Sequence, residues 1–311
     1  MSVKKYTTSG KYIDPTVDAG FKILFGREQS KEILISLLNA ILSEDLGERI
    51  DSVSFLDKEK IMETDSERSV VFDLHCITDT GKRFIVEMQN LEQEWFVERC
   101  LFYGCRAVTE QGKSGKWDYE YDPVVSIAFT NFTSRRFGAQ RMVDGAIIDC
   151  HGGKPITDRL RLIFIQLPEF RQESPEECIS ELEQWVYTIK NMKDMESIPF
   201  HTTNPIFLSV DRLARMENLS QAERREYDRG LKFYRDIQNQ YDFAVKNAIR
   251  QGVTEGRAEG RAEGRAEGRA EGRAEQTIHF AKRLLSSGLP LEDVARYAEL
   301  PLETVRQLSQ E

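Results

Sequence analysis

Two acidic residues fall on neighbouring predicted strands within the segment 70–90, VVFDLHCITDTGKRFIVEMQN. Runs rich in β-branched and aromatic residues flank a short polar loop there, a pattern typical of a β-hairpin. If Gly81 takes the left-handed position of a three-residue loop, the register places Asp73 directly across from Glu87. Gln89 lies two residues beyond Glu87 and therefore shares its face of the strand.

The charges of such a pair make it a candidate site. Opposed carboxylates have Cβ atoms about 5 Å apart, and at an effective dielectric near 20 two full charges at that distance repel by about 3 kcal/mol. Either a shared proton or a cation relieves this repulsion, and a divalent ion suits oxygen ligands. In the alternative, one acid faces solvent or pairs with Arg68 or Arg83, and the residues alone leave both interpretations open.

A helix near the amino terminus contributes further candidates. Asp14-Pro15 is typical of a helix start and Gly26 of a helix end. Asp18 and Lys22 follow helical spacing along the edge of an apolar stripe. Asp18 is then either an acid facing the site or a first-turn acid that complements the helix dipole.

Several segments in order resemble one known family. They are PTVDAGFKILFG at 15–26, FDLHC, IVEMQN and FVERCLFYGCRAV. Over residues 12–135, and more weakly to about 250, the chain resembles the recombination-promoting nuclease/putative transposase family of the PD-(D/E)xK nuclease superfamily. The resemblance implies an α/β fold with a restriction-endonuclease-like core, in which helices flank a mixed central sheet.

The resemblance also implies roles for particular residues. In that superfamily an Asp and a Glu bind a divalent ion, usually Mg²⁺ (or Mn²⁺), together with the backbone carbonyl after the Glu. The matching groups are Asp73, Glu87 and the carbonyl of Met88. Gln89 replaces the usual Lys, so it can orient water but supplies no positive charge. Asp18 matches an accessory acid of the relatives.

Contacts to DNA are expected from basic residues near these acids. Arg99, in a predicted helix at 92–112, matches a recurrent arginine of the family and either contacts a DNA phosphate or holds Glu87 through a salt bridge. Lys22 and the pair Arg135-Arg136 are further candidates. The net charge of −9 is unusual for a protein that binds nucleic acid, so binding would depend on a local basic groove.

Composition predicts a soluble cytoplasmic protein. No apolar run is long enough to cross a membrane, and the polar start MSVKKYTTSG does not resemble a signal peptide. The five cysteines are odd in number and lack paired C-x-x-C spacing, which favours reduced thiols over disulfides or zinc.

The rest of the chain continues the α/β pattern and then becomes helical. We expect strands at 123–130, 142–150 and 160–167, and helices at 175–192, 205–217 and 220–251. The predicted division is a nuclease-like core at 1–170, a helical extension at 171–251, a repeat tether at 252–275 and a helical tail at 276–311.

The tether consists of five copies of Gly-Arg-Ala-Glu over residues 256–275. Like charges recur at i,i+4 and each glycine costs about 1 kcal/mol relative to alanine, so we expect a charged, extended or fraying spacer. Packing of identical chains along its small residues is the alternative. The tail resembles a helix-turn-helix, but its nearly balanced charge is unusual for a helix that reads DNA, and a small assembly module or a docking helix pair is the alternative.

Taken together, the sequence predicts a Mg²⁺-dependent DNA endonuclease that hydrolyses phosphodiester bonds, with DNA recombination as the implied setting. The alternative is a nucleic-acid- or protein-binding module whose nuclease fold has little turnover. Cutting both strands of a duplex requires two active sites, so a homodimer is expected.

Overall fold

The computed structural model describes residues 10–42, 49–56 and 73–310. Contacts divide the chain into two units, 1–235 and 236–311. The predicted four-part division of the chain stays a prediction, and residues 70–72 of the expected hairpin, like Arg68, lie outside the described residues.

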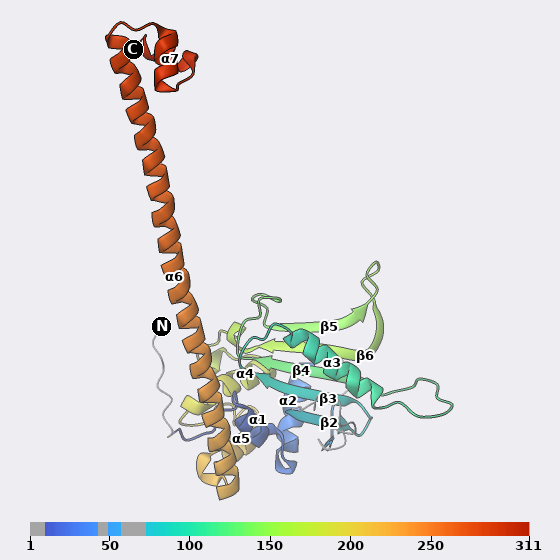
Figure 1. Ribbon diagram of the computed structural model, residues 1–311. Helices are drawn as coiled ribbons and strands as arrows, with labels where there is room; N and C mark the ends of the chain where they lie inside the picture. The colour runs from blue at the N-terminus through green and yellow to red at the C-terminus, as the bar shows by residue number, and fades with distance from the viewer. Residues whose placement is uncertain (1–9, 43–48, 57–72, 311) are drawn as a thin grey trace. The chain divides into compact units, whose positions relative to one another are not determined.

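The first unit is built on a mixed sheet of six strands (Figure 1). The strands are β1 Val53–Phe55, β2 Leu74–Thr78, β3 Arg83–Gln89, β4 Val124–Thr130, β5 Met142–Ile148 and β6 Pro155–Gln166. Their order is β1-β2-β3-β4-β6-β5. β3, β4 and β6 run parallel, whereas β1, β2 and β5 pair antiparallel with their neighbours. The expected mixed sheet is therefore confirmed.

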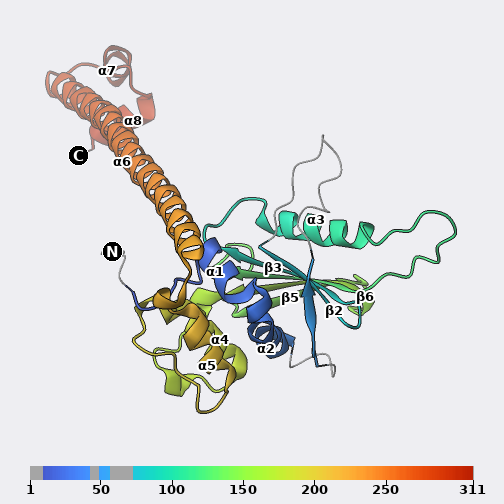
Figure 2. The same cartoon turned by 90° about the horizontal axis from the view of Figure 1, so that it is seen from below.

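Helices cover both faces of this sheet, as Figure 2 shows. One face carries α1 Asp18–Phe25, α2 Lys31–Leu42, α4 Glu181–Asn191 and α5 Ile206–Ala214, and the other carries α3 Phe96–Thr109. Short 3₁₀ helices lie at Glu28–Ser30, Leu167–Glu169, Pro175–Glu177, Met192–Asp194 and Met216–Asn218.

Successive side chains of β3 point alternately into two separate hydrophobic cores. Phe84, Val86 and Met88 belong to the large core beneath α1 and α2. Ile85 faces the other side, where it packs with Ala107 of α3. Because successive side chains of a strand point to opposite faces, Glu87 points to the α3 side with Ile85.

The first helix starts later than the sequence predicts. Asp14 does not cap it: its carboxylate accepts hydrogen bonds from the backbone and hydroxyl of Thr16 and pairs with Lys193 at 2.9 Å. The helix begins at Asp18, with Val17 at the N-cap position. The predicted start at Asp14-Pro15 was wrong because Asp14 is used in a buried contact with a residue far along the chain.

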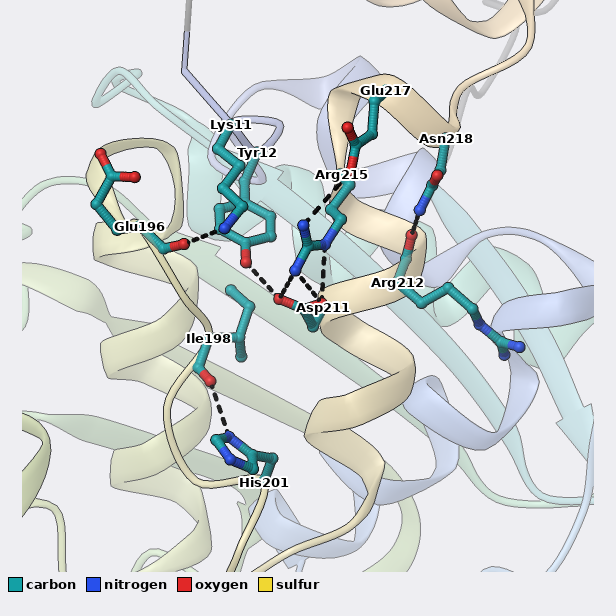
Figure 3. A network of polar contacts seen from close by, with 10 residues as sticks. All are labelled: Lys11, Tyr12, Glu196, Ile198, His201, Asp211, Arg212, Arg215, Glu217 and Asn218. Carbon is teal, nitrogen blue, oxygen red and sulfur yellow. Dashed lines mark hydrogen bonds and ion pairs between the residues drawn. The ribbon is translucent and has the colours of Figure 1, made fainter.

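A polar network fixes the residues that precede α1 against the end of α5 (Figure 3). The hydroxyl of Tyr12 donates to Asp211, and Nε of Arg215 donates to Oδ2 of the same Asp211 at 2.9 Å. The Arg215 guanidinium also lies 5.7 Å from the centre of the Tyr12 ring. Burial and the bond to Asp211 raise the pKa of Tyr12 to about 12. These contacts hold the entry to α1 in place.

The expected helix at 175–192 is divided. A 3₁₀ turn at Pro175–Glu177 precedes α4, which starts only after Ser180. The Ser180 hydroxyl accepts from the Glu183 N–H, and the Glu183 carboxylate accepts from the Ser180 N–H. This capping box stabilises a helix start at that position, and the sequence S-x-x-E contained the signal.

Helix α6 runs without interruption over Gln221–Ser286, through the whole Gly-Arg-Ala-Glu repeat. The expected extended or fraying spacer is thus a helix. Helical segments flank the repeat on both sides, so it is added to an existing helix and carries no nucleation cost of its own. In the second unit α6 is followed by α7 Leu291–Ala298 and α8 Leu302–Leu308, and a small core forms around Ala281, Val294 and Val305.

Among the described residues, no helix is both long and apolar enough to cross a membrane.

Candidate functional site

The hairpin that carries the two acids has the predicted register. Leu74 lies opposite Val86 and Ile77 opposite Arg83, and Gly81 has a φ of 88° in the connecting loop. Asp73 lies just before β2 and outside the paired residues, so its place directly opposite Glu87 stays a prediction. The N–H of Met88, next to Glu87, donates to Asp73 Oδ2 at 2.9 Å. That bond fixes the Asp73 carboxylate against the backbone of β3.

Asp73 is a buried acid whose electrostatic surroundings are unfavourable for its charge. Burial has the largest effect and, together with a hydrogen bond to Asp18 and its charge, raises the pKa of Asp73 to about 8. The Met88 N–H and the Lys22 ammonium act in the opposite direction but do not outweigh them. Near neutral pH the metal-free protein therefore keeps Asp73 largely protonated.

Lys22 links the two aspartates. Its Nζ lies 2.6 Å from Asp18 Oδ1 and 3.3 Å from Asp73 Oδ1. Burial alone would lower the pKa of Lys22, but both carboxylates raise it and the net shift is upward. The helical spacing predicted for Asp18 and Lys22 thus brings both side chains to Asp73. Lys22 thus pairs with two acids of its own chain, and its contact with DNA stays a prediction.

Glu87 is buried on the middle of the sheet. Its nearest described cation is Arg99, whose Nη2 lies 3.8 Å from Glu87 Oε2. Burial raises the pKa of Glu87, and the Arg99 charge lowers it by less, so the net direction is upward. Its neighbour on β4 is Ala128, and this small side chain leaves room for a carboxylate in the layer below α3.

Gln89 is held by the same arginine. Arg99 Nη2 donates to Gln89 Oε1 at 2.8 Å, and Gln89 Nε2 donates to the Leu91 carbonyl at 2.8 Å. A second Arg99 nitrogen donates to Gln93. Of the two interpretations that the sequence left open for Arg99, the structure has the contact with Glu87. Gln93 was missed, because nothing in its surroundings distinguishes it from other exposed glutamines.

The site therefore consists of two neighbouring clusters joined by β3. The aspartate cluster is Asp18, Lys22 and Asp73, and the glutamate cluster is Glu87, Gln89 and Arg99. Met88 lies between Glu87 and Gln89 in the chain and binds Asp73 through its N–H. The pair Arg135-Arg136 is not part of either cluster, since Arg135 pairs with Glu92 and Arg136 with Glu98.

A pocket of about 260 Å³ opens beside the aspartate cluster. Asp73, Lys22 and His75 line it together with Arg27 and Phe55. Burial, and to a smaller extent the charge of Arg83, lowers the pKa of His75 to about 4, so the imidazole is neutral at physiological pH. A larger pocket of about 620 Å³, lined by residues such as Glu32 and Arg49, includes none of the predicted site residues.

The donor set determines which metal these residues fit. Within residues 10–42, 49–56 and 73–310, no group of three or more His, Cys, Asp or Glu side chains is placed to hold an ion. From these described residues a metal at the hairpin would thus have two carboxylates at most, with backbone carbonyl and water oxygens among its other ligands. Mg²⁺ is commonly held in that way, and a cation would relieve the two buried acids whose pKa values are raised. The residues therefore fit Mg²⁺ or Mn²⁺.

Comparison with known proteins gives one match. The model of a family described as PD-(D/E)XK nuclease family transposase matches residues 15–244. No curated protein and no solved structure matches the chain. The matched range includes both clusters, the whole sheet and the first part of α6.

Proposed function

The chain belongs to the PD-(D/E)XK nuclease family of transposases, and we propose that it is a metal-dependent DNA endonuclease that hydrolyses phosphodiester bonds. The observation that carries this proposal is the approach of two buried acids to the same stretch of β3, because Asp73 accepts a hydrogen bond from the N–H of Met88, the residue that follows Glu87. Family membership makes phosphodiester cleavage the expected chemistry. DNA recombination is the setting that the family implies.

In the proposed site, Asp73, Glu87 and the Met88 carbonyl would hold Mg²⁺ or Mn²⁺. A bound ion of this kind lowers the pKa of a water ligand and neutralises charge that grows on the scissile phosphate. Binding requires Asp73 to lose its proton, because only the carboxylate is a ligand. Lys22 can then move from Asp73 to a phosphate oxygen, while Asp18 remains its partner within the helix.

The glutamate cluster would place the attacking water. Gln89 is neutral, so it can orient the water by hydrogen bonds but leaves the stabilisation of negative charge to the metal and to Arg99 and Lys22. The Gln89 amide already has two partners, because its oxygen accepts from Arg99 and its nitrogen donates to the Leu91 carbonyl. The second lone pair of its oxygen and the second N–H of its nitrogen can still bond a water.

This engagement of Gln89 also favours the second candidate function, a nucleic-acid- or protein-binding module with little turnover. Its bonds to Arg99 and Leu91 account for this residue by a contribution to the fold alone. The two candidates differ in one measurable property, since only the nuclease cuts DNA in a manner that depends on Asp73 and Glu87.

Plasmid nicking in Mg²⁺ or Mn²⁺ separates them. Asp73→Asn and Glu87→Gln keep the size of each side chain and remove its charge, and we expect each to lower the nicking rate by at least 100-fold. Asp158→Asn is the matched control, because the Asp158 side chain is 90% exposed and lies outside both clusters. Equal nicking by all preparations would mean a contaminating nuclease and would support the binding module.

A further inference from the structure

An exposed tryptophan lies beside the glutamate cluster. Trp95 is 68% exposed and occupies the N-cap position of α3. Its carbonyl accepts a hydrogen bond from the Arg99 N–H at 2.9 Å, so the two residues lie one helical turn apart on the same side of the helix. Arg99 in turn contacts Glu87 and Gln89. An exposed indole is therefore one turn away from the groups that would place the attacking water.

The backbone that carries Trp95 is tied to its surroundings. The N–H of Asn131, which follows β4, donates to the Gln89 carbonyl at 2.9 Å, and the Asn131 side chain donates to Asn90 Oδ1 at 3.1 Å. The Asn90 side chain in turn donates to the carbonyl of Thr16, just before α1. Trp95 thus extends from a segment that is held at the carboxyl ends of β3 and β4. A side chain on such a support can bind a ligand at a defined place.

The charges around Trp95 are nearly balanced. The Arg135 N–H donates to the Glu92 carboxylate at 2.8 Å, which holds the loop after β4 against the start of α3. The Arg135 side chain is 93% exposed and lies 3.5 Å from the same carboxylate, and Arg136 pairs with Glu98. Binding through DNA phosphates depends on an excess of positive charge. This edge of the sheet has little excess, so a nucleic acid bound here needs contacts that do not depend on charge.

Stacking on an aromatic ring is a contact of that kind. An exposed indole can stack on any nucleobase whose face is free, and such a stack contributes affinity without reading sequence. Inside a duplex the neighbouring base pairs cover both faces of each base, so the base has to be unpaired and unstacked first. The neighbours Gln93 and Glu94 are exposed and polar, whereas charged residues are depleted at the centre of a protein–protein contact. The surroundings of Trp95 therefore favour a nucleotide over a second protein.

We propose that Trp95 stacks on an unpaired base next to the scissile phosphate, while Arg135 binds a neighbouring phosphate. The preferred substrate is then DNA whose nucleotides at the cut are single-stranded. This inference rests on the proposed function, because it names the kind of DNA that the same site takes. The segment 90–95 thereby has a role of its own, distinct from metal binding at the hairpin.

Binding in EDTA, which prevents metal-dependent cleavage, tests this preference. Fluorescence anisotropy compares a labelled single strand of about 20 nucleotides with its duplex, and we expect the single strand to bind at least 10-fold more tightly. Trp95→Ala should weaken binding of the single strand about 10-fold and leave binding of the duplex within about two-fold. Trp95→Phe keeps a ring and should recover most of the loss. The matched control is Tyr119→Ala, because Tyr119 is also an exposed aromatic residue, at 77%, and follows the other end of α3.

Salt dependence separates stacking from charge. Stacking releases no counterions, so the loss in Trp95→Ala should be the same at 50 mM and 200 mM salt, whereas Arg135→Gln should reduce the salt slope by about 0.7. Tryptophan emission reports the stack itself. The single strand should quench the emission of the wild type and of Trp117→Phe, and Trp95→Phe should lose this quenching.

The inference and the proposed function fail in different ways. Equal affinity for single strand and duplex, wild-type binding by Trp95→Ala, or quenching that persists in Trp95→Phe would each overturn the inference, even if plasmid nicking depends on Asp73 and Glu87. Binding of neither DNA at about 100 µM would also overturn it and would leave a protein contact as the use of Trp95. Stacking without any nicking that depends on Asp73 would overturn the nuclease proposal instead.

Discussion

Replacement of Asp73 by asparagine should stabilise the metal-free protein at neutral pH. The pKa of Asp73 is raised from 3.8 to about 8 by burial and by Asp18. Between these two values the folded state keeps a proton that the unfolded chain releases, so the stability contributed by this group is lost as the pH rises through that range. Asparagine carries no such penalty, and its amide oxygen can still accept from the Met88 N–H.

The size of the effect follows from the difference in pKa. Between pH 3.8 and pH 7 the loss of folding free energy grows by about 1.4 kcal/mol for each pH unit. At pH 7 the full penalty is therefore about 4 kcal/mol. Asp18 shares this electrostatic interaction, so part of the penalty belongs to both residues. We therefore expect the Asp73→Asn protein to be more stable than the wild type by about 2 kcal/mol at pH 7, with a gain that shrinks towards pH 4.

Urea unfolding in EDTA, followed by tryptophan fluorescence at pH 4, 5, 6, 7 and 8, measures this gain. Asp158→Asn serves as the control and should track the wild type at every pH. A difference between Asp73→Asn and wild type that does not grow with pH, or a variant that is less stable at pH 7, would refute the description of Asp73 as a buried acid next to a second carboxylate.

Three further predictions concern the same hairpin. Gly81→Ala should destabilise the fold by about 1–2 kcal/mol in urea unfolding, because Gly81 has a φ of 88° and a Cβ there would lie 2.6 Å from the Asp122 carboxylate; an unchanged midpoint would contradict the loop geometry. Arg99→Met should raise the pKa of Glu87 further, and the acidic limb of the nicking profile should move to higher pH; an unmoved limb would mean that Arg99 does not act on Glu87. Mn²⁺ at about 100 times its dissociation constant should stabilise the wild type by about 2.7 kcal/mol in thermal unfolding. The same Mn²⁺ concentration should leave the stability of Asp73→Asn unchanged. Equal stabilisation of both proteins would mean that the ion binds elsewhere.

Local signals predicted the hairpin well. β-Branched and aromatic residues on both sides of a loop that ends in glycine were enough to determine the register, since a shift of one residue would turn Val86 and Leu74 out of the core. The spacing of Asp18 and Lys22 on one helix was also visible in the sequence. What the sequence could not show was that Lys22 reaches Asp73, because that contact depends on how α1 packs on the sheet.

The predictions that failed depended on structure outside the local sequence pattern. Asp14 has the local pattern of a helix cap, but Lys193 lies 179 residues away in the chain and no local pattern indicates that contact. The repeat has poor helix propensity by its own composition, yet the helix continues through it from flanking segments. Arg99 fitted two roles equally well, and only the position of α3 over β3 determined that it contacts Glu87.

Anomalous diffraction from crystals soaked in Mn²⁺ tests the central claim most directly. The proposed site predicts one strong peak within about 2.2 Å of a carboxylate oxygen of both Asp73 and Glu87, and no peak there in crystals of Asp73→Asn. A peak bound by only one of these acids, or by neither, would contradict the proposal that the hairpin holds the metal for phosphodiester cleavage.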